Sequence, residues 1–132
     1  MKFMLMMLAP SQTGDWAVSR WSAEDFQAHI RFMKDFARRL ERNGELVAAE
    51  GLDSPAEARI VKAGPGGAPD VTDGPFAETK EFLAGFWIVD CESRERAYQI
   101  AAEASAAPGP GGAPINIPIE VRQVMGAPPV EV

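Results

Sequence analysis

Apolar residues recur along the chain in patterns that separate strands from helices. Residues 1–10 and 82–91 carry apolar side chains at both alternating sets of positions, which is typical of strands buried on both faces. Shorter apolar segments bounded by turn residues predict further strands at residues 46–52, 58–62, 70–72 and 115–122. Pro118 cannot donate to a sheet ladder, so we expect it at an edge or at the beginning of the last strand.

Two other segments have the periodicity of amphipathic helices. The first is predicted to begin at Ser22, whose hydroxyl can accept from the amide three residues on, and to end at Asn43-Gly44. At about 100° per residue, one face of this helix collects its apolar side chains and a histidine: Phe26, His29, Ile30, Met33, Phe36, Ala37 and Leu40. The second helix begins at Ser93 and ends before Pro108.

The order strand, helix, strand, hairpin, strand, helix, strand predicts an α+β fold. It is the order of a ferredoxin-like βαββαβ antiparallel sheet with both helices on one face. Because the helices cover only one face, a monomer would leave the other apolar face exposed to water. We therefore expect a homodimer whose two sheets close a dimeric α+β barrel around a cavity. The domain is expected to span residues 1–126, with a C-terminal tail at 127–132.

Composition narrows the classes of partner and compartment. The 132 residues are 46% hydrophobic and 24% charged, as in an ordinary globular domain. A net charge of -6 argues against direct binding to nucleic acid or to anionic membranes. The one cysteine, Cys91, lies in an apolar strand, which favours a reducing cytoplasm. The apolar start is short for a signal peptide, and we interpret it as the first strand, with no membrane span.

A nine-residue run from Asp73 to Glu81, DGPFAETKE, is followed by Phe82-Leu83-Ala84-Gly85-Phe86-Trp87. This segment resembles the signature of the DGPF or YCII-related family. The resemblance implies a dimeric α+β barrel, a superfamily that includes cofactor-free isomerases, dehydrochlorinases and monooxygenases of small, often aromatic molecules. Members of the DGPF group mostly lack an assigned reaction, and some are encoded beside, or fused to, alternative sigma factors.

Two residues are candidates for moving a proton. His29 is the one histidine, and a neutral imidazole acts as a base near pH 7 when a carboxylate orients it. The resemblance implies the same role, because broader YCII relatives are thought to use a His-Asp pair on the corresponding helix. The alternative is a histidine at the edge of the core that bonds to backbone. Asp73 is either a turn residue that accepts from backbone amides or a base at the cavity mouth.

Four further residues are candidates for holding a substrate. Phe76 and Trp87 would supply aromatic walls, although Trp87 also fits plain core. Charges on strands cost free energy inside a barrel unless they are paired or bind a ligand. Arg122, with Glu50 or Glu120 as its partner, is therefore our candidate anchor for an anionic ligand.

The sequence leaves two functions open, and with them whether the chain is an enzyme. One is a cofactor-independent isomerase or lyase that acts on a small aromatic or anionic molecule by acid-base chemistry. The other is a non-catalytic dimeric module that binds a ligand or a protein, and the resemblance implies a link to sigma-factor-dependent transcription. We expect no metal and no cofactor, because one histidine and one cysteine give no metal-ligand spacing and no phosphate loop is present.

Overall fold

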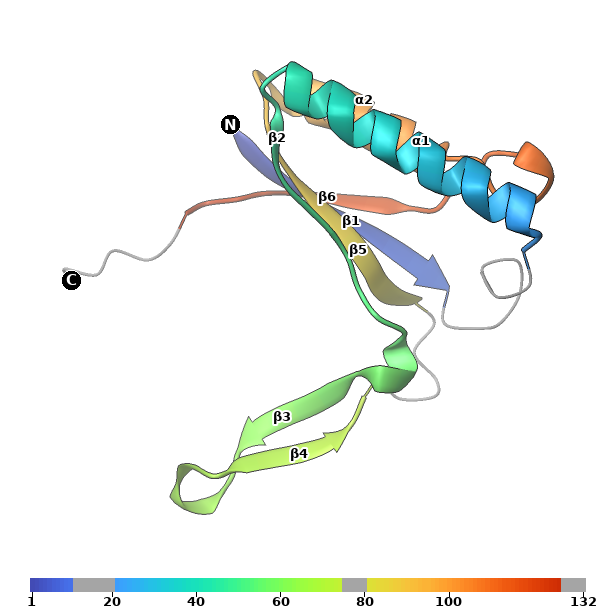
Figure 1. Ribbon diagram of the computed structural model, residues 1–132. Coiled ribbons are helices and arrows are strands. Elements are labelled where there is room, and N and C mark those ends of the chain that lie inside the picture. Colours follow the sequence, from blue (N-terminus) through green and yellow to red (C-terminus); the bar gives the residue numbers. More distant parts are fainter. Residues whose placement is uncertain (11–20, 75–80, 127–132) are drawn as a thin grey trace.

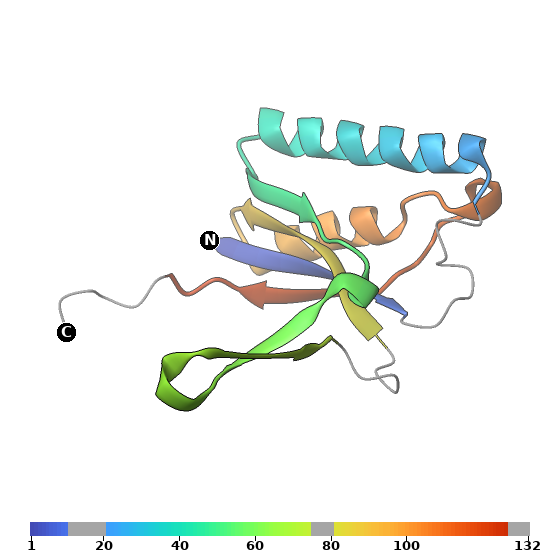
Figure 2. The same ribbon diagram turned by 60° about the horizontal axis from the view of Figure 1, so that its bottom comes forward.

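A four-stranded antiparallel sheet forms the centre of the molecule, in the order β2-β5-β1-β6. The computed structural model describes residues 1–10, 21–74 and 81–126, so the tail at 127–132 lies outside it. The main elements are β1 Lys2–Pro10, α1 Ala23–Arg42, β2 Leu46–Gly51, β5 Glu81–Asp90, α2 Arg94–Ser105 and β6 Ile119–Gln123. Both helices cover the same face of the sheet (Figures 1 and 2). The predicted ferredoxin-like α+β fold is confirmed.

A two-stranded hairpin stands apart from this sheet. It consists of β3 Arg59–Ala63 and β4 Pro69–Asp73, and both views place it on the side of the sheet away from the helices (Figures 1 and 2). In the described part of the chain, short turns of 3₁₀ type lie in the connections at η2 Pro55–Glu57, η3 Pro65–Gly67 and η4 Pro110–Gly112.

Local capping groups set the helix boundaries where the sequence predicts them. The Ser22 hydroxyl accepts from the Asp25 amide at 3.1 Å, and the Ser93 hydroxyl accepts from the Arg96 amide at 3.1 Å. After α1 the chain turns at Gly44, whose φ of 72° lies in the left-handed region that favours glycine.

The core lies between the helices and one face of the sheet. Phe3, Leu5 and Met7 of β1 are buried against Phe36 and Leu40 of α1. Four apolar residues of α2 complete this layer: Ala97, Ile100, Ala101 and Ala104. The alternate β1 residues, Met4, Met6 and Leu8, are only half-buried. Each set of β1 side chains therefore points to its own face, as the alternation predicts.

A bulge in β5 puts Leu83 on the opposite face of the sheet from the one that simple alternation predicts. Simple alternation puts Leu83 on the same face as Trp87, but Met7 pairs with Gly85 and Leu8 pairs with Leu83. Ala84 is thus the extra residue, and Leu83 shares its face with Leu8 instead. Gly85 lies close to β2, since a Cβ on it would be 2.9 Å from the Glu50 carbonyl oxygen.

The last strand is shorter than predicted, because β6 begins at Ile119 and not at residue 115. The preceding segment bonds outside the sheet: the Ile115 amide donates to Ala107 at 2.9 Å and the Asn116 amide donates to Ser105 at 2.8 Å. Asn116 has a φ of 56°, which is incompatible with a strand. Pro118 comes directly before β6, an edge strand, as its missing donor requires.

The face of the sheet away from the helices, here called the open face, is apolar in the middle. Residues paired across strands share a face, so the register gives its rows directly. One row runs Ala48, Ile88, Met4, Arg122, and the next runs Glu50, Phe86, Met6, Glu120. Charged residues lie only on the outer strands of these two rows.

None of the described helices is both long and apolar enough to cross a membrane.

Candidate functional site

A cavity of about 390 Å³ lies between α1 and the strands β2 and β5, on the helix-covered side of the sheet. This volume is within the range of pockets that hold small molecules. Its lining is mainly apolar: Met7, Phe26, His29, Ile30, Met33, Ala37, Ala49, Glu50, Gly51, Ala84, Gly85, Phe86 and Trp87. None of these described lining residues is a lysine or an arginine.

The apolar stripe of α1 forms one wall of the cavity, because only the C-terminal part of the stripe is packed in the core. Phe36 and Leu40, near the C-terminal end, are 0% and 3% exposed. Phe26, two turns and more toward the N-terminus, is 42% exposed although it lies on the same stripe. The first half of the stripe is therefore a cavity wall and not core.

His29 places an imidazole on this wall, and its ring is fixed at one nitrogen. Nδ1 lies 3.0 Å from the carbonyl oxygen of Pro108. Because a carbonyl can only accept, Nδ1 carries the hydrogen and donates it, and in the neutral ring Nε2 then holds the lone pair. The indole of Trp21 meets the imidazole edge to face, with 5.4 Å between ring centroids. Nε2 is thus the ring nitrogen that can serve a ligand.

The loop that carries Pro108 is itself held to α1. The Gly111 amide donates to the Asp25 carboxylate at 3.0 Å, one helical turn before His29. Gly109 also lies against Ile115, where a Cβ would be 2.7 Å from Cγ1. One contact to α1 and one within the connection itself therefore fix the position of the carbonyl that orients the imidazole.

Three of the six residues that the sequence singles out contribute to this one lining. They are His29, Glu50 and Trp87. Trp87 is 7% exposed and packs edge to face on Phe36, so it belongs to the core as well as to the wall. Glu50 is exposed on the edge strand β2, where it and its pairing partner Phe86 border the cavity and also belong to an open-face row.

The other three predicted residues lie elsewhere or outside the described residues. Asp73 ends β4 with a fully exposed side chain, and the Arg59 guanidinium lies 3.7 Å from it. Arg122 lies in the open-face row of Met4, with Glu120 at 3.9 Å. Within one chain, Arg122 and His29 are thus on opposite sides of the sheet. Phe76 lies outside the described residues.

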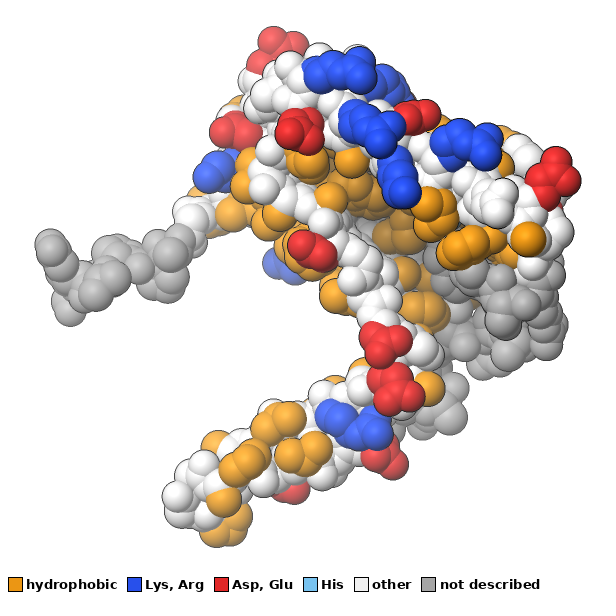
Figure 3. Space-filling model, viewed as in Figure 1, with side chains coloured by type: hydrophobic (Ala, Val, Ile, Leu, Met, Phe, Trp, Pro, Cys, Tyr) orange, Lys and Arg blue, Asp and Glu red, His pale blue; other side chains and the backbone are white. Residues whose placement is uncertain are grey.

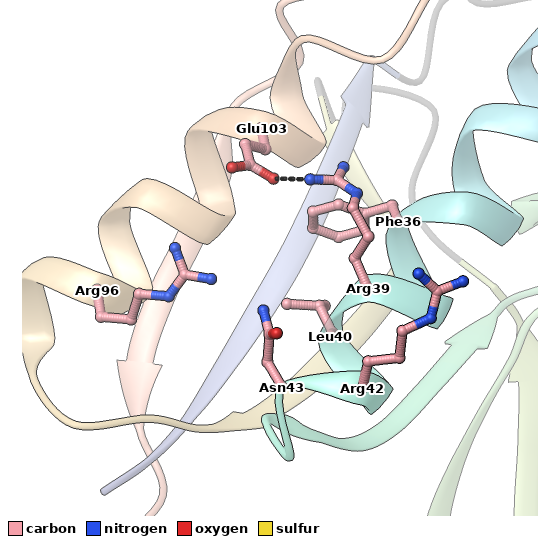
Figure 4. Close-up of a pocket in the computed structure, with 7 residues that line it drawn as sticks. All are labelled: Phe36, Arg39, Leu40, Arg42, Asn43, Arg96 and Glu103. Carbon is pink, nitrogen blue, oxygen red and sulfur yellow. Dashed lines mark hydrogen bonds and ion pairs between the residues drawn. The ribbon is translucent and has the colours of Figure 1, made fainter.

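A second hollow, of about 160 Å³, lies between α1 and α2 (Figure 4). Three arginines border it, but two of them are neutralised by carboxylates. Arg39 donates to Glu103 at 3.2 Å, as the dashed line shows, and Arg96 donates to Glu45 at 2.8 Å from each of two nitrogens. This hollow is a helix-to-helix contact with paired charges, so we do not assign it a ligand.

Other chemistry has little support among the described residues. No group of three or more histidine, cysteine or acidic side chains in this part of the chain is arranged to hold a metal ion. Burial raises the pKa of the Cys91 thiol, which donates to the Ser93 carbonyl at 3.3 Å. A thiol held protonated in this way is a poor nucleophile.

Sequence reasoning finds His29 but not the groups that position it. The Pro108 oxygen belongs to the backbone and lies 79 residues away along the chain, so no residue type marks it. The cavity itself does leave a signal, since the apolar stripe of α1 extends over about four turns, from Phe26 to Leu40. An apolar helix face that the core does not bury completely indicates either a partner or a pocket.

Comparison with known proteins agrees with the fold and the signature run. The protein-family model of the YCII-related domain matches residues 1–112. An uncharacterised protein of Rhizobium meliloti (strain 1021) is 36% identical over 89 residues, which cover 67% of this chain and 71% of that protein. The chain therefore belongs to the YCII-related family.

Proposed function

We propose that this chain binds a small, uncharged and largely aromatic molecule in the cavity between α1 and the sheet. The single observation that carries the proposal is an apolar cavity of about 390 Å³ with one oriented imidazole in its wall. Ligand sites typically combine an apolar lining with a few polar groups that fix orientation. The absence of a lysine or arginine from the described lining favours a neutral ligand over an anion.

His29 gives this site a proton acceptor. With Nδ1 donating to Pro108, Nε2 can take a proton from an acidic C–H or O–H of the bound molecule and return it to another atom of the same molecule. Such a transfer balances within one substrate and needs no cofactor, as in an isomerase. A backbone carbonyl holds the tautomer of the ring but, unlike a carboxylate, adds no negative charge to stabilise the imidazolium.

Thermal shift with matched probes tests the binding. Phenol and indole are neutral aromatic probes, and benzoate adds a negative charge to the same ring. A neutral probe at about 100 times its Kd stabilises the folded state by about 2.7 kcal/mol, which raises the Tm by about 10 °C for a chain of this size. Ala37→Phe fills the cavity and should abolish the shift, whereas Gln27→Phe, an exposed position of α1, should preserve it. Equal Tm shifts in the two variants would contradict the assignment of the binding site to this cavity.

Proton exchange tests the chemistry separately. In D₂O, a bound neutral ketone or lactone with an acidic C–H should lose that proton signal in the presence of the protein. His29→Gln keeps a hydrogen-bonding side chain but no base, so exchange should fall to the buffer rate while binding persists. Unchanged exchange in His29→Gln would leave a binding protein without catalysis at this residue.

The proposal includes a homodimer formed through the open face. Met4, Met6, Phe86 and Ile88 lie on this face and are only half-buried in the single chain. Exposed apolar patches of this kind mark protein contacts, and a symmetric copy offers the same patch in return. Sedimentation should show a dimer at micromolar concentration that Met6→Asp converts to monomer. A monomeric wild-type protein would overturn this part.

A further inference from the structure

We infer that the β3–β4 hairpin is a dimerisation arm that packs its Val61–Val71 face against a second copy of this chain. The inference rests on the proposed homodimer and goes beyond it, because it assigns part of the interface to a segment outside the four-stranded sheet. We call residues 59–73 the arm.

The arm stands clear of the rest of the chain. All ten residues of its two strands are exposed, and Figure 3 shows it separated from the body by a wide notch, with hydrophobic side chains along it. An isolated two-stranded hairpin is marginal in water, since it has no layer to bury its apolar side chains. The apolar side chains of the arm can therefore be buried only against a surface that the single chain does not provide.

The register divides the arm into two unlike faces. Val61 pairs with Val71 and Ala63 pairs with Pro69, so this face is apolar except at its base, where the Arg59–Asp73 ion pair lies on the same side. Val61 and Val71 are 60% and 54% exposed. The opposite face carries Ile60 with Thr72 and Lys62 with Asp70, and is mostly polar. The valine face is the one that needs cover.

The base of the arm is closed by local contacts between its two ends. Arg59 donates to the carbonyls of Ala56 and Ala58 at 3.2 and 2.7 Å, and it pairs with Asp73 across the strands. Gly74 packs so closely on Ala58 that a Cβ there would be 2.5 Å from the carbonyl oxygen. These contacts join the two ends of the arm and explain why the DGPF run has a glycine at position 74.

Area favours a second copy as the occupant. Four strands about 4.8 Å apart and three side-chain rows about 7 Å apart outline an open face of roughly 400 Å². A stable interface buries about 800 Å² on each partner, so the open face alone is too small. The arm lies on the same side of the sheet as the open face (Figures 1 and 2), where a copy seated on that face comes within reach.

Charge and symmetry agree with this occupant. The arm contains two basic and two acidic residues, Arg59, Lys62, Asp70 and Asp73, and is neutral within a chain of net charge -6. It can approach an acidic copy without added repulsion. In a two-fold dimer each chain gives one arm and receives one, so the same contact forms twice.

Sedimentation of matched variants of the full chain tests the arm. Val61→Asp combined with Val71→Asp should weaken the dimer at least tenfold, while Ile60→Asp on the opposite face should change its Kd less than twofold. These side chains are exposed, so far-UV circular dichroism should match the wild type. Equal weakening by Ile60→Asp would overturn the assigned face. A dimer that Met6→Asp dissociates and the valine variant does not would overturn the arm and leave the proposed homodimer intact.

Hydrogen exchange of the wild-type protein provides a second readout. Amides of the arm should be protected above the dimer Kd and lose that protection on dilution, because a lone hairpin opens readily. Protection that is the same at both concentrations would contradict the inference, as would a wild-type monomer at every concentration, which would overturn the homodimer as well.

Discussion

Glu45 and Arg96 form the strongest charged contact among the described residues. The guanidinium donates twice to the carboxylate at 2.8 Å, and the side chains are only 13% and 25% exposed. We expect Glu45→Gln to lower the free energy of unfolding by about 1.5 kcal/mol, because charge-assisted hydrogen bonds contribute more than neutral ones. Urea unfolding near neutral pH measures this. Glu103→Gln, which breaks a half-exposed pair with Arg39, is the control and should cost less than about 0.5 kcal/mol.

The same pair predicts a pH dependence. The hydrogen bonds from Arg96 hold the pKa of the Glu45 carboxyl below its ordinary value of 4.5. Since the folded pKa is the lower one, the contribution is complete above the unfolded pKa and is lost as the pH falls through the folded pKa. The stability gap between wild type and Glu45→Gln should therefore narrow between about pH 5 and pH 3 in urea titrations. A gap that is constant over this window would contradict the assignment.

At the level of elements, the apolar stripe of α1 has two roles: its C-terminal half is core, and its N-terminal half is the wall of the cavity. Phe36→Ala should cost about 3 to 4 kcal/mol, since Phe36 is fully buried in the core. Phe26→Ala should cost less than about 1 kcal/mol, because the side chain is 42% exposed. It should nevertheless weaken binding of a neutral aromatic probe several-fold. Thermal melts with and without indole separate the two effects, and equal destabilisation by both variants would mean that the N-terminal half of the stripe is core.

Local signals explain how much of the fold the sequence predicts. Ser22, Ser93 and Gly44 set helix ends through contacts within a few residues, so their positions follow from the chain itself. The beginning of β6 does not, because the amides of residues 115 and 116 bond to the end of α2 instead of to the sheet. The bulge at Ala84 likewise depends on how β1 and β5 meet.

The candidate site, like the fold, is only partly predictable from the sequence. His29 stands out in the sequence because helical periodicity puts a histidine on an apolar face. Pro108 and Trp21, which hold its ring, come from segments whose approach is a tertiary event. Arg122 lies on the open face, the face that the expected dimer barrel encloses, so its role as an anion anchor stays a prediction and is separate from the cavity beside His29. The side of the sheet on which a residue lies, and not its residue type, therefore distinguishes His29 from Arg122.

For the whole molecule, the two sides of the sheet have separate tasks in this account. The helix-covered side holds the cavity with His29, and in the proposed dimer the open face and the arm receive a second copy. Glu50 and Phe86 belong to both sides, because they line the cavity and also lie in an open-face row, whereas the other residues of the two sides are distinct. The methionines report on this division, because Met7 and Met33 line the cavity while Met4 and Met6 lie on the open face.

Titration of methyl-labelled methionine with indole, followed by carbon–proton NMR, tests the central claim most directly. The account predicts that the methyl signals of Met7 and Met33 shift in a saturable way, while those of Met4 and Met6 stay where they are. Methyl groups within the cavity feel the ring current of a bound aromatic, and those across the sheet do not. No saturable shift at Met7 or Met33, or shifts confined to Met4 and Met6, would contradict a ligand site beneath α1.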